Sequence, residues 1–148
     1  MGQKTNTIDK EYILNRISDW KYRLNQLYEN VESWSRDCAV SDIIKKELPL
    51  AKEELMQKFC IEPDNITALA IKSGESRTSF VPMGLWVVGS NGRVNIRTNT
   101  HQYILVDLGD NEDFTSDWTV VNPSKRGQKI HFDKAVMSKL LKDEDLFA

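Results

Sequence analysis

The sequence has few of the residues that mark secreted, membrane-spanning or metal-dependent proteins. Its 148 residues include two cysteines, two histidines and four prolines. No apolar run approaches the roughly 18 residues of a membrane-spanning helix, and the first residues lack the apolar core of a secretory signal. We therefore predict a cytoplasmic chain without membrane association, in which Cys38 and Cys60 stay reduced and act as small apolar residues.

The motifs of common catalytic and cofactor sites are also absent. The glycines do not form a phosphate-binding or dinucleotide-binding spacing, and no serine stands in a nucleophile elbow. His101 and His131 have no Cys, Asp or His neighbour at zinc-ligand spacing. We expect no cofactor and favour a protein that is not an enzyme, although a catalytic triad assembled from distant residues stays open.

The composition is that of a folded protein of one domain, residues 1–148. Hydrophobic residues make up 40% and charged residues 28%, which argues against disorder. The formal net charge is −2, so a nucleic-acid role would need a local basic patch. Basic residues occur in runs no longer than two, and we do not expect binding to a duplex through many phosphates.

A long amphipathic helix is predicted over residues 8–37. Seven apolar residues recur at alternating spacings of four and three, which places them on one stripe. We also predict a short helix at 50–59, after Pro49, and a C-terminal helix at 133–142 that Asp133 caps. The stripe of the long helix consists of Ile13, Ile17, Trp20, Leu24, Leu27, Val31 and Trp34.

Between these helices, residues 66–132 change to a period of two, which predicts an antiparallel meander of five or six strands. Asn91-Gly92 predicts a two-residue type I′ turn, which would set Trp86 opposite Arg97. Pro82 predicts an edge position or a bulge. The stretch 40–48 is short and mixed and is not predicted to be a strand. The predicted class is therefore α+β, with the long and short helices packed on the meander.

The strict heptad of the long helix has two interpretations. A parallel coiled coil would set Arg16 against Lys21 of the partner, a like-charge contact, and two seam tryptophans are wide for a two-stranded coil. We therefore favour packing of the stripe within its own chain. The alternative is an intermolecular contact, including a homo-oligomer, with partner-binding residues Arg16, Trp20, Arg23, Leu27 and Trp34.

The predicted hairpin around Asn91-Gly92 offers a candidate ligand surface. Its outer face would carry an indole, two guanidiniums and an amide, which can stack on a planar ring and hold an anion. The simpler interpretation is a cross-strand contact in which Arg97 covers Trp86. The candidate ligand-binding residues are Trp86, Arg93, Asn95, Arg97 and His101.

Five carboxylates within a short stretch form a second candidate site. Oxygen clusters can hold Mg²⁺ or Ca²⁺, which suggests a small metal-dependent hydrolase or nuclease with His101 or Lys129 assisting. The spacing does not match an EF-hand loop, so a solvated acidic loop is the simpler interpretation. The cluster consists of Asp107, Asp110, Glu112, Asp113 and Asp117.

Two functional hypotheses follow from these surfaces. The first is a non-enzymatic binding or regulatory protein, of accessory, inhibitor or immunity type. It would engage a protein partner or an anionic, nucleotide-like small molecule. The second is the metal-dependent hydrolase or nuclease built on the acidic cluster.

Overall fold

The computed structural model describes residues 10–38, 40, 42–49, 65–84, 91–110 and 115–147. The predicted helix at 50–59 and the residues Cys60, Trp86, Glu112 and Asp113 lie outside the described residues. The described elements are α1 (Lys10–Arg36), β1 (Asp42–Pro49), β2 (Asn65–Ser73), β3 (Ser76–Gly84), β4 (Arg93–Arg97), β5 (Gln102–Asp107), β6 (Trp118–Asn122), β7 (Lys125–His131) and α3 (Lys134–Leu141).

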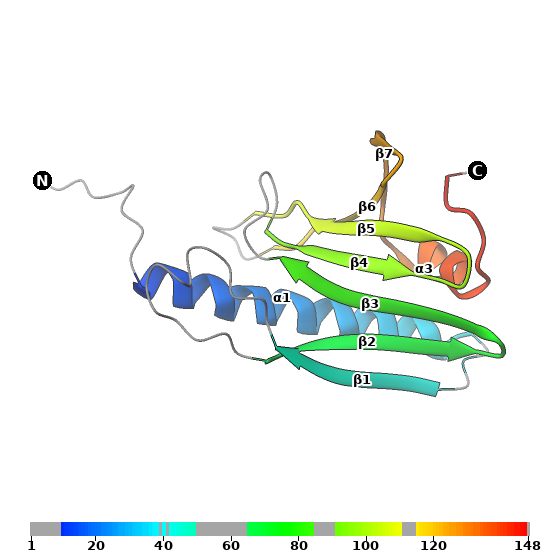
Figure 1. Ribbon diagram of the computed structural model, residues 1–148, viewed down its shortest axis with the longest axis horizontal. Coiled ribbons are helices and arrows are strands. Elements are labelled where there is room, and N and C mark those ends of the chain that lie inside the picture. The colour runs from blue at the N-terminus through cyan, green and yellow to red at the C-terminus, as the bar shows by residue number, and fades with distance from the viewer. Residues whose placement is uncertain are drawn as a thin grey trace, which may run out of the picture.

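The seven strands form one open antiparallel sheet, and neighbours in the sequence are neighbours in the sheet, in the order β1-β2-β3-β4-β5-β6-β7 (Figure 1). The predicted α+β class and antiparallel meander are confirmed, with seven strands in place of five or six. Within the described residues, no helix is both long and apolar enough to cross a membrane.

The long helix α1 packs along the sheet through the predicted stripe (Figure 1). Ile13, Trp20 and Val31 are completely buried, and they share one core with strand residues such as Leu69, Phe80 and Leu105. Each fully buried side chain of this size stabilises the fold by roughly 1.5–3 kcal/mol relative to its exposed state. The stripe therefore packs within its own chain, as the favoured interpretation predicts.

The edge strand β1 was not predicted from the sequence. Its residues Asp42 to Pro49 pair with Lys72 to Asn65 of β2 in an antiparallel register. The strand has two adjacent isoleucines and two adjacent lysines, so hydrophobic and polar residues do not alternate along it. An edge position tolerates this pattern, because charged residues there also discourage pairing with other chains.

The predicted two-residue turn at Asn91-Gly92 is wrong. Arg93 pairs with Gly84, and the β3 partner of Arg97 is Ser79 in place of the predicted Trp86. Asn91 also lacks the positive φ that a type I′ turn requires at both central positions. Gly92 does have a positive φ of 149°. Its role is close packing, because a Cβ atom there would lie 2.3 Å from Cζ3 of Trp20.

Two other local predictions are confirmed. The register between β3 and β4 shifts between Pro82 and Gly84, which is the bulge that a proline inside a strand indicates. Asp133 is the N-cap of α3, and its carboxylate accepts a hydrogen bond of 2.9 Å from the amide of Val136. The predicted C-terminal helix at 133–142 corresponds to α3, which packs against α1 on the same face of the sheet.

Candidate functional site

The face of the sheet opposite α1 carries the first candidate site. On β4, Val94 and Ile96 point into the core, whereas Arg93, Asn95 and Arg97 alternate with them and point to the other face. Pairing then adds side chains from both neighbouring strands to this face, because paired residues in an antiparallel sheet project to the same side. Val81 and Ile104 lie on either side of Asn95, and Ser79 and Gln102 lie on either side of Arg97. We call this the outer face.

The outer face contains a hollow of about 390 Å³ over β3, β4 and β5. Two guanidiniums and two side-chain amides line it, together with an apolar wall, and none of the lining residues that the structure describes is acidic. Arg93 is half-buried, and its Nε donates a hydrogen bond of 3.1 Å to Oδ1 of Asn95. The lining residues include Val81, Met83, Arg93, Asn95, Arg97, Gln102 and Ile104.

This hollow has the chemistry of an anion site. A guanidinium presents paired N–H donors to a phosphate or carboxylate, and two of them on one surface can hold an anion from two directions. The structure brings three of the predicted ligand residues, Arg93, Asn95 and Arg97, onto one surface. Trp86, the fourth, lies outside the described residues.

His101, the fifth predicted ligand residue, lines a neighbouring hollow of about 590 Å³ that shares Gln102, Tyr103 and Pro123 with the first. Its ring stacks on Tyr103 at a centroid distance of 5.9 Å, and its Nδ1 lies 3.2 Å from Asp143. Because Asp143 ties it to the C-terminal segment, His101 has a structural partner that the sequence did not indicate.

Asp143 is the centre of a small polar cluster at this end of the sheet. Burial acts to raise the pKa of its carboxyl, but hydrogen bonds from Thr98, Thr100 and His101 outweigh that effect and hold the pKa below its usual value. Asp143 is also in the left-handed region, with a φ of 56°. The cluster therefore keeps the carboxylate ionised and anchors the turn that follows α3.

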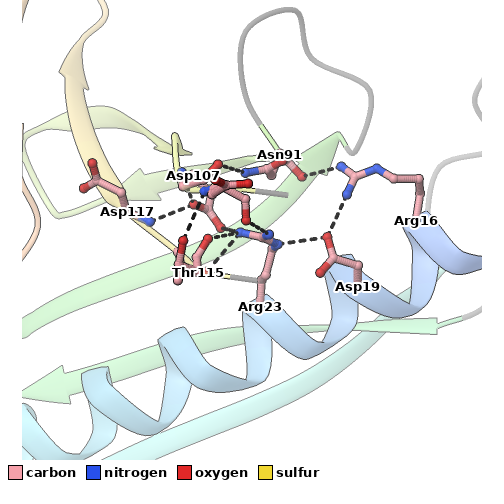
Figure 2. Close-up of polar contacts among 10 residues, drawn as sticks. Arg16, Asp19, Arg23, Asn91, Asp107, Thr115 and Asp117 are labelled. Carbon is pink, nitrogen blue, oxygen red and sulfur yellow. Dashed lines mark hydrogen bonds and ion pairs between the residues drawn. The ribbon is translucent and has the colours of Figure 1, made fainter. Parts of the chain in front are cut away.

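A buried ion pair on the helix side forms the second polar centre (Figure 2). Arg23 and Asp107 both have fully buried side chains, and Nη1 of Arg23 lies 2.8 Å from Oδ2 of Asp107. Asp19, one turn before Arg23 on α1, accepts from Arg23 Nε at 2.9 Å. Burial acts to lower the pKa of Arg23, but the hydrogen bonds and charges of Asp107 and Asp19 outweigh it, and its pKa is raised.

Backbone groups complete the hydrogen bonding of this pair. Nη1 and Nη2 of Arg23 donate to the carbonyls of Thr115 and Asp110 at 2.6 and 3.0 Å. Oδ1 of Asp107 accepts from the amides of Gly109 and Asp117 at 2.9 and 2.8 Å. The pair therefore joins α1 to both ends of the β5–β6 connection, and the desolvation of the two charges is offset by a full set of partners.

The three described members of the acidic cluster, Asp107, Asp110 and Asp117, have different surroundings. Asp107 is buried and committed to Arg23, whereas the side chain of Asp117 is half-exposed and lies 3.2 Å from His131. Asp110 accepts a hydrogen bond from Arg23 through its backbone carbonyl. In the described part of the chain, no three His, Cys, Asp or Glu residues come together as metal ligands would. The described carboxylates do not converge, and the hydrolase hypothesis stays a prediction because Glu112 and Asp113 lie outside the described residues.

The predicted partner-binding residues of the long helix are mostly interior. Trp20, Arg23 and Leu27 are at most 1% exposed, so they would meet a partner only if α1 left the sheet. Trp34 packs edge-on against Phe132 with a centroid distance of 5.6 Å. Arg16 is nearly buried and pairs with Asp19 at 2.6 Å. These residues thus pack within the chain's own fold, as the favoured interpretation predicts, and their role in binding a partner stays a prediction.

The Arg23–Asp107 pair was missed from the sequence, although a signal for it exists. Asp107 is two and four residues after Leu105 and Tyr103, so it shares their inward face of β5. Arg23 lies three residues after Trp20 and four before Leu27, beside the apolar stripe. An inward carboxylate and an arginine beside a core stripe indicate a buried pair, since a buried charge requires a partner.

Comparison of the chain with protein-family models, with curated proteins and with solved structures found no match.

Proposed function

We propose that this chain is a non-enzymatic binding protein that holds an anionic group of its ligand on the outer face of the sheet. The observation that carries the proposal is the hollow lined by Arg93, Asn95 and Arg97, in which two guanidiniums have no acidic side chain beside them within the described part of the chain. Charged residues are normally paired or spread on a surface, so two cations on one hollow favour an anionic occupant.

The size and lining of the hollow favour a ligand with both an anionic and an apolar part. Small-molecule sites range from about 300 to 1,000 Å³, and this hollow of about 390 Å³ lies at the lower end. Val81, Met83 and Ile104 supply the apolar wall, and Asn95 and Gln102 supply amides that hydrogen-bond in both directions. A nucleotide-like molecule has these features.

ATP is the first probe for this site, measured by calorimetry at low salt. We expect Arg93→Ala and Arg97→Ala each to weaken ATP binding about tenfold, because each removes a charged hydrogen bond of roughly 1.5–3 kcal/mol. Arg36→Ala is the matched control, since its side chain is 68% exposed at the end of α1 and carries the same charge. Equal ATP affinity in the wild type and both outer-face variants, or no binding at all, would contradict the proposal.

A further inference from the structure

The basic surface extends beyond the hollow toward the β1 edge of the sheet. A second hollow, of about 220 Å³, lies over β1, β2 and β3 and includes Lys46 and Arg77. It shares Ser79 and Val81 with the first hollow, so the two are continuous. Lys46 and Arg77 therefore belong to the same surface as Arg93 and Arg97.

The surface also continues to the opposite edge. Ile104 lines the first hollow and pairs with Val121, which pairs with Lys129 of β7. The side chain of Lys129 is therefore on the outer face as well. With neighbouring strands about 4.8 Å apart, the seven strands give this face a width of roughly 29 Å. The basic side chains of this face include Lys46, Arg77, Arg93, Arg97 and Lys129, which are spread across the sheet.

These five side chains have no ion-pair partner among the described residues. The contrast with the helix side is clearest on β1, where Lys45 lies 3.0 Å from Glu32 of α1 while its neighbour Lys46 points to the outer face. Asp42 and Asp117 are acidic residues at the rim of this face, and Asp145 lines the neighbouring hollow that contains His101. A chain with a formal net charge of −2 therefore concentrates unpaired positive charge on one face.

The apolar content of this face favours a charged polymer over a protein partner. Among the described residues, Met83 and Leu108 are large apolar side chains on or next to this face that are exposed, at 48% and 39%, and Val81 and Ile104 are half-buried. Stable protein interfaces have an apolar core that is depleted of charged residues, whereas on this face basic side chains lie among the apolar ones. A nucleic acid binds mainly through its phosphates, for which cations and amides are sufficient. A single strand can lie along an open sheet, whereas a duplex groove is read by an inserted helix or ribbon.

We infer that the outer face binds single-stranded nucleic acid. Its phosphates contact the five basic side chains from Lys46 to Lys129, and its bases face the floor formed by Val81, Asn95 and Ile104. This inference rests on the proposed function and specifies the ligand class of the same surface. A chain with a net negative charge needs a local basic patch to bind a polyanion, and these basic side chains form such a patch.

The test is a binding titration followed by fluorescence anisotropy of a labelled 20-nucleotide single-stranded oligouridylate, repeated at salt concentrations from about 50 to about 200 mM. If five phosphates are contacted, log K falls against log salt with a slope of about −3.5, which is about a 100-fold loss over this range. Lys46→Ala and Lys129→Ala should each reduce the slope by about 0.7. Lys45→Ala is the matched control, because its side chain lies on the opposite face of the same strand.

Each other result has a definite meaning. If ATP binds through Arg93 and Arg97 but the oligouridylate binds no more tightly than ATP, the inference is wrong and the proposed function stands. If neither probe binds, both are wrong. Equal affinity for a duplex, or for poly-glutamate of similar length, would also overturn the inference, because the surface would then bind any polyanion or an acidic protein segment.

Discussion

The two faces of the sheet differ in the burial and ion pairing of their arginines. On the helix side, Arg23 is completely buried and its charge is matched by Asp107 and Asp19. On the outer face, Arg97 is exposed and no described carboxylate lies within ion-pair distance of it. Both arginines stand next to a buried apolar residue in the sequence, Leu24 after Arg23 and Ile96 before Arg97, so their different roles come from the tertiary environment.

This difference separates charges used for folding from charges available for binding. A buried cation must have a fixed partner, since desolvation of an isolated charge costs several kcal/mol. A cation at the surface keeps its hydration and needs no partner within the chain. We therefore expect substitutions on the helix side to change stability and substitutions on the outer face to change binding.

The largest expected loss of stability is for Asp107→Ala. It leaves the buried Arg23 without its main partner and removes the acceptor for two backbone amides, so we expect the free energy of unfolding to fall by about 3–5 kcal/mol. Urea denaturation measures the change. Asp117→Ala, which removes a half-exposed carboxylate, is the control, and a change below about 1 kcal/mol for Asp107→Ala would contradict the structural role of the pair.

Gly92→Ala tests the close packing of α1 on β4. The added methyl would lie within 2.6 Å of three ring atoms of Trp20, at a φ of 149° that non-glycine residues rarely adopt. We expect a loss of about 1–3 kcal/mol from overpacking, measured by thermal or urea unfolding. Gly127→Ala is the control, because nothing lies within 4 Å of the added methyl there. Equal stabilities of the two variants would show that Trp20 can move away.

Tyr28→Phe tests a buried hydroxyl on the helix side through its pH dependence. Burial raises the pKa of Tyr28, and its hydroxyl donates a 2.6 Å hydrogen bond to the carbonyl of Thr67. In the unfolded chain the tyrosine hydroxyl ionises at about pH 10. Between that pH and the raised pKa the unfolded chain binds fewer protons, so stability is fully present below about pH 10 and falls above it.

The substitution Tyr28→Phe should cost about 1 kcal/mol at neutral pH and should flatten this alkaline loss. Urea denaturation at a series of pH values measures both effects. Tyr22→Phe, whose side chain is 54% exposed, serves as the control. The interpretation fails if the alkaline loss is as steep in Tyr28→Phe as in the wild type.

The smallest expected effect on stability is for Arg97→Ala. An exposed side chain without a partner contributes little to folding, so we expect a change within about 0.5 kcal/mol in urea denaturation. The same variant should lose binding on the outer face. A stability loss as large as that of Asp107→Ala would contradict the distinction between the two faces.

Periodicity was sufficient to predict α1 and the alternation of β4. The stripe from Ile13 to Val31 repeats without interruption, and Arg93, Asn95 and Arg97 alternate with Val94 and Ile96. Local sequence patterns did not predict β1, and they predicted the wrong structure at Asn91-Gly92. The edge strand needs no alternation, and Gly92 is required by the indole of Trp20, a contact 72 positions away that no local rule contains.

The wider basic surface could not be predicted from the sequence for a related reason. Lys46, Arg77 and Lys129 are far apart in the chain and come together only through the register of seven strands. In the acidic cluster, the described Asp107 and Asp117 are ten positions apart in the sequence. The fold separates them, with Asp107 turned into the core and Asp117 turned toward solvent.

The most direct test of the contrast between the two faces is an NMR titration of ¹⁵N-labelled protein with the single-stranded oligouridylate. The account predicts that the largest amide shift changes fall on β3, β4 and β5, including Arg93 to Arg97, while the amides of α1 around Arg23 stay unchanged. Shift changes concentrated on α1 or α3, with β4 unaffected, would contradict it.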